Sequence, residues 1–179
     1  MLRSLKRRAE FKHKAGEIYG AIVTQARQPV FYARLGIPDT PTGRYEMVVI
    51  HLFLVLERLR GADAEAMAQG LVDAFVSDMD DSLRELGIGD VGVPRRVKRA
   101  AAGFYERSKD YRAALVGGEG VLESVVARHL ATDAGDGRLG PLADYIRAAA
   151  ASLAAQQAAA LTDGCLFFPD PAANTKSAP

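Results

Sequence analysis

The acidic side chains best placed to bind a metal form one short run, Asp78-Met79-Asp80-Asp81-Ser82. On a helix, Asp78 and Asp81 would share a face, with Glu85 one turn further on. All-helical enzymes acting on prenyl diphosphates use such carboxylates to hold magnesium, an ion that prefers oxygen ligands. Those enzymes take their carboxylates from two helices, and the sequence offers no second cluster of this kind in a long helix. We interpret the run as a solvated helix face, and keep a prenyl-diphosphate enzyme using the Asp78/Asp81 face as an alternative.

His51 is the other side chain with chemical potential, because imidazole serves as a general base or a metal ligand. Its neighbours at helical spacing are all apolar: Met47, Val48, Leu54 and Val55. No second ligand accompanies it, as a metal site would require. The pattern predicts a buried, neutral, structural histidine that is hydrogen-bonded to a loop carbonyl or to Asp39.

The remaining candidates do not form a catalytic arrangement. Gly117-Gly118-Glu119-Gly120 lacks the preceding strand and the Lys-Ser/Thr of a phosphate-binding loop. No Gly-x-Ser-x-Gly elbow is present. The single cysteine, Cys165, has no internal disulfide partner and fits a reducing compartment. We expect no metal, no cofactor and no enzymatic activity.

Basic residues are concentrated at the N-terminus, where residues 1–14 hold six lysines and arginines against one acid, Glu10. Apolar side chains are interspersed among them, as in a helix that lies on an anionic membrane surface. The candidates for this contact are Lys6, Arg7, Arg8, Lys12 and Lys14. The same segment also suits an arm that binds a partner, or a solvated face packed on the domain.

A second basic cluster precedes the aromatic pair Phe104-Tyr105 and consists of Arg95, Arg96, Lys98 and Arg99. Basic charge at a helix N-terminus opposes the helix dipole, which strengthens the case for a binding role relative to an ordinary charge run, and a solvated helix start is the alternative. The formal net charge of the chain is only +1, so its total charge does not indicate nucleic acid. A nucleic-acid-binding regulator remains an alternative, and it requires a continuous basic face joining this cluster to residues 6–14.

The elements that must position these residues are helical throughout. The 179 residues predict one domain, all-α and compact, with about six helices around a buried central helix at about 44–60. We expect a basic N-terminal helix or arm at 1–28, a helical domain at 29–165 and a flexible tail at 166–179. Residues 36–43 read as a loop, Glu46 as part of the first turn of the next helix, and 141–162 as one long final helix. No apolar run is long enough to cross a membrane.

Three segments resemble the ubiquinol-cytochrome c chaperone family, whose members assist assembly of the cytochrome bc1 complex. They are FYARLGIPDTPTGRYEM, VVIHLFLVLERL and MDDSLRELGIGDVGVPRRVKRAAAGFYERSKDY, and with the preceding basic helix they cover most of residues 17–115. The resemblance implies a non-enzymatic protein that binds newly made cytochrome b. It further implies a small partner protein, ribosome contact and a position at the membrane surface. The chain resembles a bacterial-type member, which implies a cytoplasmic, peripheral location at the inner membrane; for a eukaryotic member the location would be the mitochondrial matrix side.

The turn in the first segment supplies the residues expected to carry these contacts. We expect Tyr32, Arg34 and Arg44, together with the second basic cluster, to bind the client or a partner. We assign structural roles in the turn to Pro38, Asp39, Thr40 and Gly43, because short polar side chains and glycine stabilise such turns locally.

Overall fold

The structure is a computed structural model that describes residues 2–60, 62, 64–85, 93–118, 120–131 and 138–174, with side chains described for 10–60, 62, 64–82, 98–118, 120–131 and 138–173. Its helices are α1 (Leu2–Ala26), α2 (Pro29–Ala33), α3 (Pro41–Leu59), α4 (Glu65–Glu85), α5 (Val93–Leu115), α6 (Val121–Leu130), α7 (Gly140–Ala155) and α8 (Ala158–Thr162), followed by the 3-10 turn η1 (Pro171–Asn174). No strand occurs among these residues, so the all-α prediction is confirmed.

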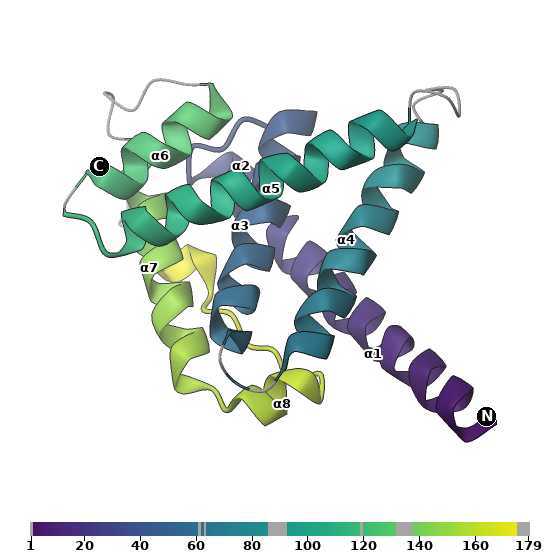
Figure 1. Cartoon of the computed structure of the whole chain (residues 1–179). Coiled ribbons are helices and arrows are strands. Elements are labelled where there is room, and N and C mark those ends of the chain that lie inside the picture. Colours follow the sequence, from purple (N-terminus) through teal and green to yellow (C-terminus); the bar gives the residue numbers. More distant parts are fainter. Residues whose placement is uncertain are drawn as a thin grey trace.

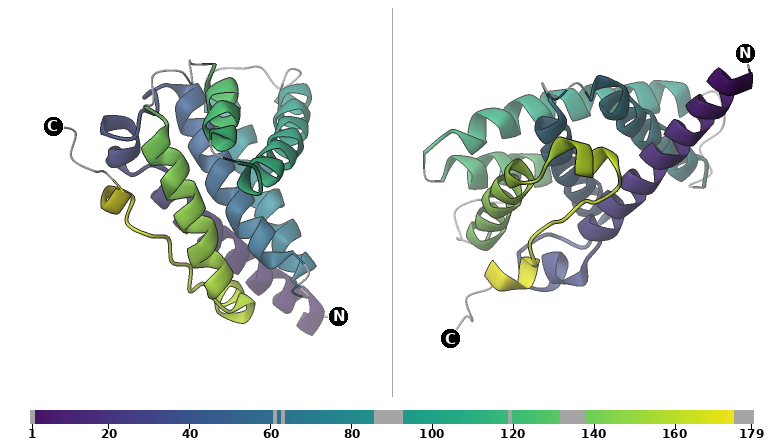
Figure 2. Two further views of the ribbon diagram at one scale, coloured as in Figure 1. Left: turned by 90° about the vertical axis from the view of Figure 1, so that its left-hand side faces the viewer. Right: turned by 90° about the horizontal axis from the view of Figure 1, so that it is seen from below.

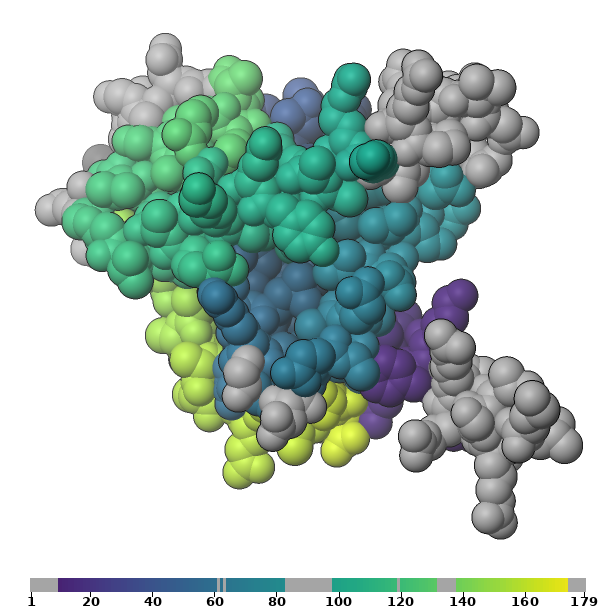
Figure 3. All heavy atoms as spheres, viewed as in Figure 1, coloured from purple at the N-terminus to yellow at the C-terminus, as the bar shows by residue number. Residues whose placement is uncertain are grey.

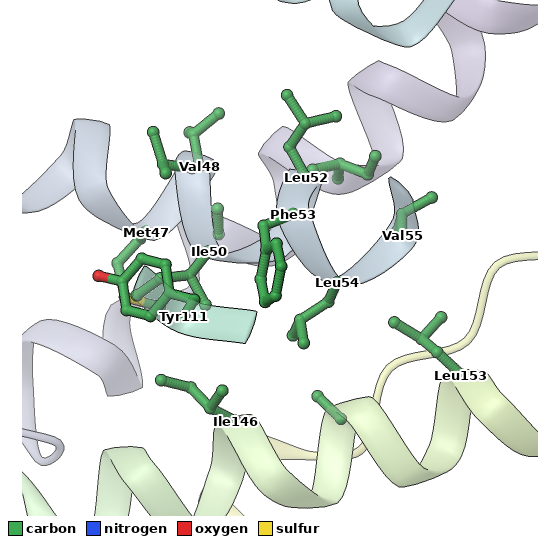
Figure 4. Packing of buried hydrophobic residues seen from close by; sticks show 14 of the residues in the cluster. Met47, Val48, Ile50, Leu52, Phe53, Leu54, Val55, Tyr111, Ile146 and Leu153 are labelled. Carbon is green, nitrogen blue, oxygen red and sulfur yellow. The ribbon is translucent and has the colours of Figure 1, made fainter. Parts of the chain in front are cut away.

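Helix α3 lies at the centre of the fold, because its sequence is apolar on every side. Every residue from 46 to 55 is buried, and Figure 4 shows side chains among them, such as those of Val48 and Leu54, pointing in different directions. Helices α1, α4, α5, α6 and α7 all contact it, and Figures 1 and 2 show them arranged around it. The predicted central helix is therefore the core of the protein.

The start of α3 differs from the prediction in a physically informative way. The helix begins at Pro41, so residues 41–43 belong to its first turn and not to the predicted loop. Proline is favoured in the first turn, where its missing N–H would have no helical partner. The hydroxyl of Thr40 caps the helix by accepting from the Gly43 N–H at 3.1 Å. Glu46 therefore lies beyond the first turn of α3. The predicted interaction of its carboxylate with the helix dipole is confined to the first turn and does not apply to it.

The predicted final helix at 141–162 is divided in two, and this prediction was wrong. Helix α7 ends at Ala155, Gln156 and Gln157 have extended backbones, and α8 starts at Ala158. Arg58 donates to the Gln156 carbonyl from Nε, at 2.9 Å, and from Nη2. The Gln156 side chain in turn accepts from the Phe167 N–H at 3.1 Å and donates to its carbonyl at 2.7 Å. These long-range contacts stabilise the break in an alanine-rich segment that favours helix by propensity alone.

The two ends of the chain contribute to the same body. The buried residues Ala15, Ile18 and Ile22 place the second half of α1 in the core, while its N-terminal turns extend away from the other helices (Figure 1). Residues 166–174 run back along the domain, with Phe168 packed on the core and η1 in contact with α7 and α2 (Figure 2). The last part of the predicted tail, 175–179, lies outside the described residues.

Candidate functional site

The loop that leads into α3, residues 34–40, is held rigidly by close backbone packing. Gly36 has a positive φ of 80°, and a Cβ there would meet the Arg138 carbonyl oxygen at 2.9 Å. A Cβ on Gly43 would lie only 2.0 Å from the Pro38 carbonyl oxygen. We call this loop, together with the first turn of α3, the elbow. Its glycines are required by the shape of the chain.

A depression of about 670 Å³ lies beside the elbow, lined by Arg27, Pro29, Tyr32, Ala33, Asp39 and Arg44. It brings together two of the predicted contact residues, Tyr32 and Arg44, whereas Arg34 is exposed and does not line it. The Arg44 Nε donates to the Asp39 carboxylate at 2.7 Å, and this hydrogen bond lowers the Asp39 pKa. The Tyr32 hydroxyl donates to the Ala26 carbonyl at 2.9 Å, and partial burial raises its pKa. The depression offers cationic and aromatic groups to a ligand, and its carboxylate and hydroxyl are engaged in the hydrogen bonds just described.

His51 is completely buried on the side of α3 that faces α7. Its Nδ1 lies 2.7 Å from the Met47 carbonyl and its Nε2 lies 2.8 Å from the Tyr145 hydroxyl. Because a carbonyl can only accept, Nδ1 carries the hydrogen and Nε2 accepts from Tyr145. Burial lowers the pKa of His51 to about 4, so the ring is neutral at physiological pH. The prediction that His51 would be hydrogen-bonded to a loop carbonyl or to Asp39 was wrong, because its two ring nitrogens are hydrogen-bonded to Met47 on α3 and Tyr145 on α7.

A further depression is a groove between α1 and α4, and the sequence reasoning did not anticipate it. We call it the α1–α4 groove. It has a volume of about 980 Å³ and is lined by Phe11, Lys12, Gly16 and Tyr19 of α1 and by Ala66, Gln69, Gly70, Asp73, Ala74, Ser77, Asp78 and Asp81 of α4. In the space-filling view the surface of α1 (purple) adjoins that of α4 (blue) (Figure 3).

The helices approach closely along this groove because small residues face each other. A Cβ on Gly70 would lie 2.9 Å from the Ala15 Cβ, so this contact admits no larger side chain without a shift. The Tyr19 hydroxyl donates to the Asp78 carboxylate at 2.8 Å and links the two walls. The signal in the sequence was the presence of glycines inside helices, which cost about 1 kcal/mol each relative to alanine and therefore need a reason.

The acidic run assigned to a solvated face contributes to this groove. Asp78 and Asp81 both line it, as the enzyme alternative requires. Their carboxylates come from one helix, however, and the facing charged side chain on α1 is Lys12. Within the described part of the chain, no three His, Cys, Asp or Glu side chains are grouped as a metal site requires. The arrangement therefore lacks the opposed carboxylates on which the diphosphate chemistry depends.

The predicted membrane-contact lysines differ in their surroundings. Lys12 is exposed at the groove, whereas the Lys14 ammonium donates to Asp163 at 2.8 Å and so ties α1 to the segment after α8. The side chains of Lys6, Arg7 and Arg8 lie outside the described residues.

The second basic cluster lies at the start of α5. Lys98 and Arg99 are exposed there, and the side chains of Arg95 and Arg96 lie outside the described residues. Helix α4 contacts both α1 and α5, runs between α1 and the start of α5 (Figure 1), and exposes Asp73 and Asp81. The continuous basic face that the nucleic-acid alternative requires stays a prediction, because the side chains of Lys6, Arg7, Arg8, Arg95 and Arg96 lie outside the described residues.

Glu46 is a structurally important residue that sequence reasoning assigned to the wrong environment. It is fully buried and accepts from the Tyr111 hydroxyl at 2.6 Å and from the Arg107 Nε at 2.8 Å. Burial alone would lower the Arg107 pKa, but the hydrogen bond and charge of Glu46 raise it. Arg107 also lies over the Tyr45 ring, 5.5 Å from its centroid. This network attaches α5 to the start of α3, close to the elbow.

Fold and site together define an all-helical protein with ligand-sized depressions at its surface. The buried polar side chains of Glu46, His51 and Ser108 are hydrogen-bonded within the protein. None of its described helices is long and apolar enough to span a membrane. The chain belongs to the ubiquinol-cytochrome C chaperone family, whose model matches residues 33–168. It is similar to a Cbp3 homolog from Brucella abortus, known from a crystal structure, with 36% sequence identity and a TM-score of 0.82 over 96% of this chain and 97% of that one. No curated protein matches the chain. The resemblance found in the elbow and α3 is thereby confirmed.

Proposed function

We propose that this protein is an assembly chaperone of the cytochrome bc1 complex that holds newly made cytochrome b at the membrane surface. The observation that carries the proposal is the family match, which spans residues 33–168 and includes the elbow and the whole central helix. A chaperone needs exposed binding surfaces and no reacting groups. The elbow depression and the α1–α4 groove supply such surfaces.

The proposed location is peripheral, on the cytoplasmic face of the inner membrane in a bacterium or the matrix face in a mitochondrion. The projecting N-terminal turns of α1 support it, because Lys6, Arg7 and Arg8 fall on them. Each basic residue near an anionic bilayer contributes about 1 kcal/mol of attraction. A small partner protein and the ribosome are further partners proposed from the family resemblance.

Client contact at the elbow is proposed for Tyr32, Arg34 and Arg44. The Tyr45 hydroxyl donates to the Ala100 carbonyl at 3.3 Å and holds the start of α3 beside the start of α5. Lys98 and Arg99 are exposed on α5 and immediately precede Ala100 in the chain. We therefore propose them, with Arg95 and Arg96, as an extension of the client-binding surface at the elbow.

Deleting the gene tests the proposal directly. We expect assembled cytochrome b to fall while its messenger RNA is unchanged, and a tagged copy of the protein to co-purify newly made cytochrome b. Normal levels of assembled cytochrome b in the deletion strain would refute the function.

The membrane location has its own test. Reversing the charges of Lys6, Arg7 and Arg8 is expected to abolish binding to vesicles containing anionic lipid. The measurement is made at low salt, because exposed charges are screened beyond about 10 Å at 0.1 M salt. A single reversal at the exposed Lys109 on α5 is the control. Unchanged binding by the triple variant would refute the location and leave the client proposal standing.

A further inference from the structure

We propose that the α1–α4 groove is a docking site for an apolar, helical protein segment that carries basic residues along one side. The inference rests on the proposed function and deepens it, since it names the chemistry of the client segment. Three features of the groove carry it: its apolar base, the open space over Gly16 and its acidic wall.

The base of the groove suits a helix. Phe11, Gly16, Ala66, Gly70 and Ala74 supply apolar surface from both helices, and the volume of about 980 Å³ is at the upper end of the range for ligand sites. A helix bound in a groove uses apolar side chains at i, i+3, i+4 and i+7 as anchors. Burying them contributes about 25 cal/mol per Å² of apolar surface removed from water.

Gly16 leaves space that the protein itself does not use. A Cβ at this position would have no neighbour within 4 Å among the described atoms, in contrast to Gly70, where it would meet Ala15. A glycine inside a helix costs roughly 1 kcal/mol relative to alanine. Neither backbone conformation nor internal packing accounts for Gly16, and a close approach by an external chain at the groove does.

The charge of the groove selects the occupant. Asp73, Asp78 and Asp81 line one wall, against the single cation Lys12 on the other. Asp73 and Asp81 are exposed and eight positions apart on α4, which places their Cα atoms about 12 Å apart at the helical rise of 1.5 Å per residue. A helix lying along α4 would pair with them through basic residues spaced seven or eight positions apart. Loops of membrane proteins on the cytoplasmic side are rich in lysine and arginine close to their apolar spans, so a nascent membrane protein supplies this combination.

The same charges disfavour the other occupants. In a symmetric dimer formed through this surface, the three acids of each copy would face either the same acids of the partner or its single cation, Lys12. An anionic membrane would be repelled by the acidic wall. A basic, apolar segment of another protein is the occupant that satisfies both the apolar base and the acidic wall.

Fluorescence anisotropy with synthetic peptides tests the inference. The probe is an 18-residue helical peptide rich in leucine and alanine with two lysines eight positions apart, and its control has glutamates at those positions. We expect the lysine peptide to bind at least tenfold more tightly, since two exposed ion pairs contribute up to about 1 kcal/mol each and the glutamate peptide adds repulsion.

Substitutions in the protein separate the groove from the rest of the surface. Gly16→Leu is expected to weaken binding of the lysine peptide at least tenfold by filling the open space. Gly20→Leu is the matched control, because Gly20 lies one turn along α1, is equally open and does not line the groove. Leucine is a better helix former than glycine, so loss of folding does not explain the loss of binding. Asp81→Lys is expected to weaken binding, and Glu106→Lys, a charge reversal at an exposed site on α5, is not.

The inference fails if the lysine and glutamate peptides bind equally, or if Gly16→Leu binds as the wild type does. It also fails if Gly16→Leu abolishes a concentration-dependent dimer seen by sedimentation, or abolishes binding to anionic vesicles, because the groove would then serve a second copy or a membrane.

Co-purification of cytochrome b separates this failure from failure of the proposed function. If both wild type and Gly16→Leu capture cytochrome b equally, the groove is refuted and the function stands. If neither captures it while the wild type binds the lysine peptide, the function is refuted and the groove stands.

Discussion

Replacing Gly43 by alanine is expected to destabilise the protein strongly, although alanine is the better helix former. The added Cβ would lie 2.0 Å from the Pro38 carbonyl oxygen and 3.1 Å from the Ile37 Cγ2. An unstrained carbon–oxygen contact is about 3.3 Å or more. The elbow must therefore move by more than an ångström relative to α3, and the obstacle is backbone that cannot rotate away.

The magnitude follows from three contributions. Overpacking of this kind costs about 1–3 kcal/mol, and a backbone neighbour places it at the upper end. The shift also breaks the cap, because Thr40 accepts from the Gly43 N–H and donates its own N–H to the Pro38 carbonyl at 2.8 Å. Losing a cap costs about 1 kcal/mol. Alanine returns about 1 kcal/mol in helix propensity, so we expect a net loss of about 3 kcal/mol in the free energy of unfolding.

Urea unfolding followed by circular dichroism measures this loss, and Gly16→Ala is the matched control. Gly16 is also a helical glycine, but its added Cβ meets nothing within 4 Å. We expect it to stabilise the protein by up to about 1 kcal/mol, so the two variants should shift stability in opposite directions. If Gly43→Ala unfolds at the wild-type urea concentration, or if both variants shift in the same direction, the packing argument for the elbow is wrong.

Three further predictions concern hydrogen-bonded side chains. Glu46→Gln is expected to cost about 3 kcal/mol in the free energy of unfolding, because it leaves the partly buried Arg107 without its counter-charge. Stability is expected to fall between pH 6.5 and 4 by up to about 3 kcal/mol on account of His51, because burial lowers its pKa from 6.5 to about 4 and the unfolded chain takes up the proton first. This part of the pH dependence should be absent from His51→Gln. Gln156→Ala is expected to raise amide hydrogen exchange around Phe167, whose backbone it holds at both N–H and carbonyl, without changing exchange in the central helix.

Each of these has a result that would contradict it. The Glu46 prediction fails if Glu46→Gln costs no more than Glu57→Gln, since Glu57 pairs with Arg112 at the surface and exposed pairs contribute at most about 1 kcal/mol. The pH prediction fails if wild type and His51→Gln lose stability in parallel below pH 6.5. Unaltered exchange at Phe167 would show that residues 166–174 stay in place through their apolar contacts alone.

The sequence predicted the parts of the fold that depend on local pattern. Apolar residues at helical spacing predicted an all-α chain, and an almost wholly apolar segment marked α3, predicted at about 44–60, as the central helix. The Pro-Asp-Thr-x-x-Gly motif was predicted to form a turn because proline, threonine and glycine constrain the backbone within a few residues of themselves. Such signals are contained in a short window of sequence.

The features that were missed depend on residues far apart in the chain. Glu46 was placed by its distance from a helix start, but its environment is set by Arg107 and Tyr111, which are 61 and 65 positions away. The break after α7 depends on Arg58, which is 98 positions from Gln156. The α1–α4 groove likewise exists only because two helices separated by the whole of α3 pack against each other. No periodicity within one helix contains this information.

The helical glycines show how a structure separates residues required by the fold from those that point to function. Gly43 and Gly70 each have a neighbour that an added Cβ would meet below 3 Å, so the fold accounts for them. Gly16 and Gly20 have none, and nothing in the structure explains Gly20. Of these two open positions, only Gly16 lines a groove with an acidic wall. The unexplained stability cost of this glycine coincides with a groove of about 980 Å³ and with an excess of carboxylates along it. That coincidence makes Gly16 the residue at which a bound partner, and not the protein's own packing, is expected to set the allowed size of the side chain.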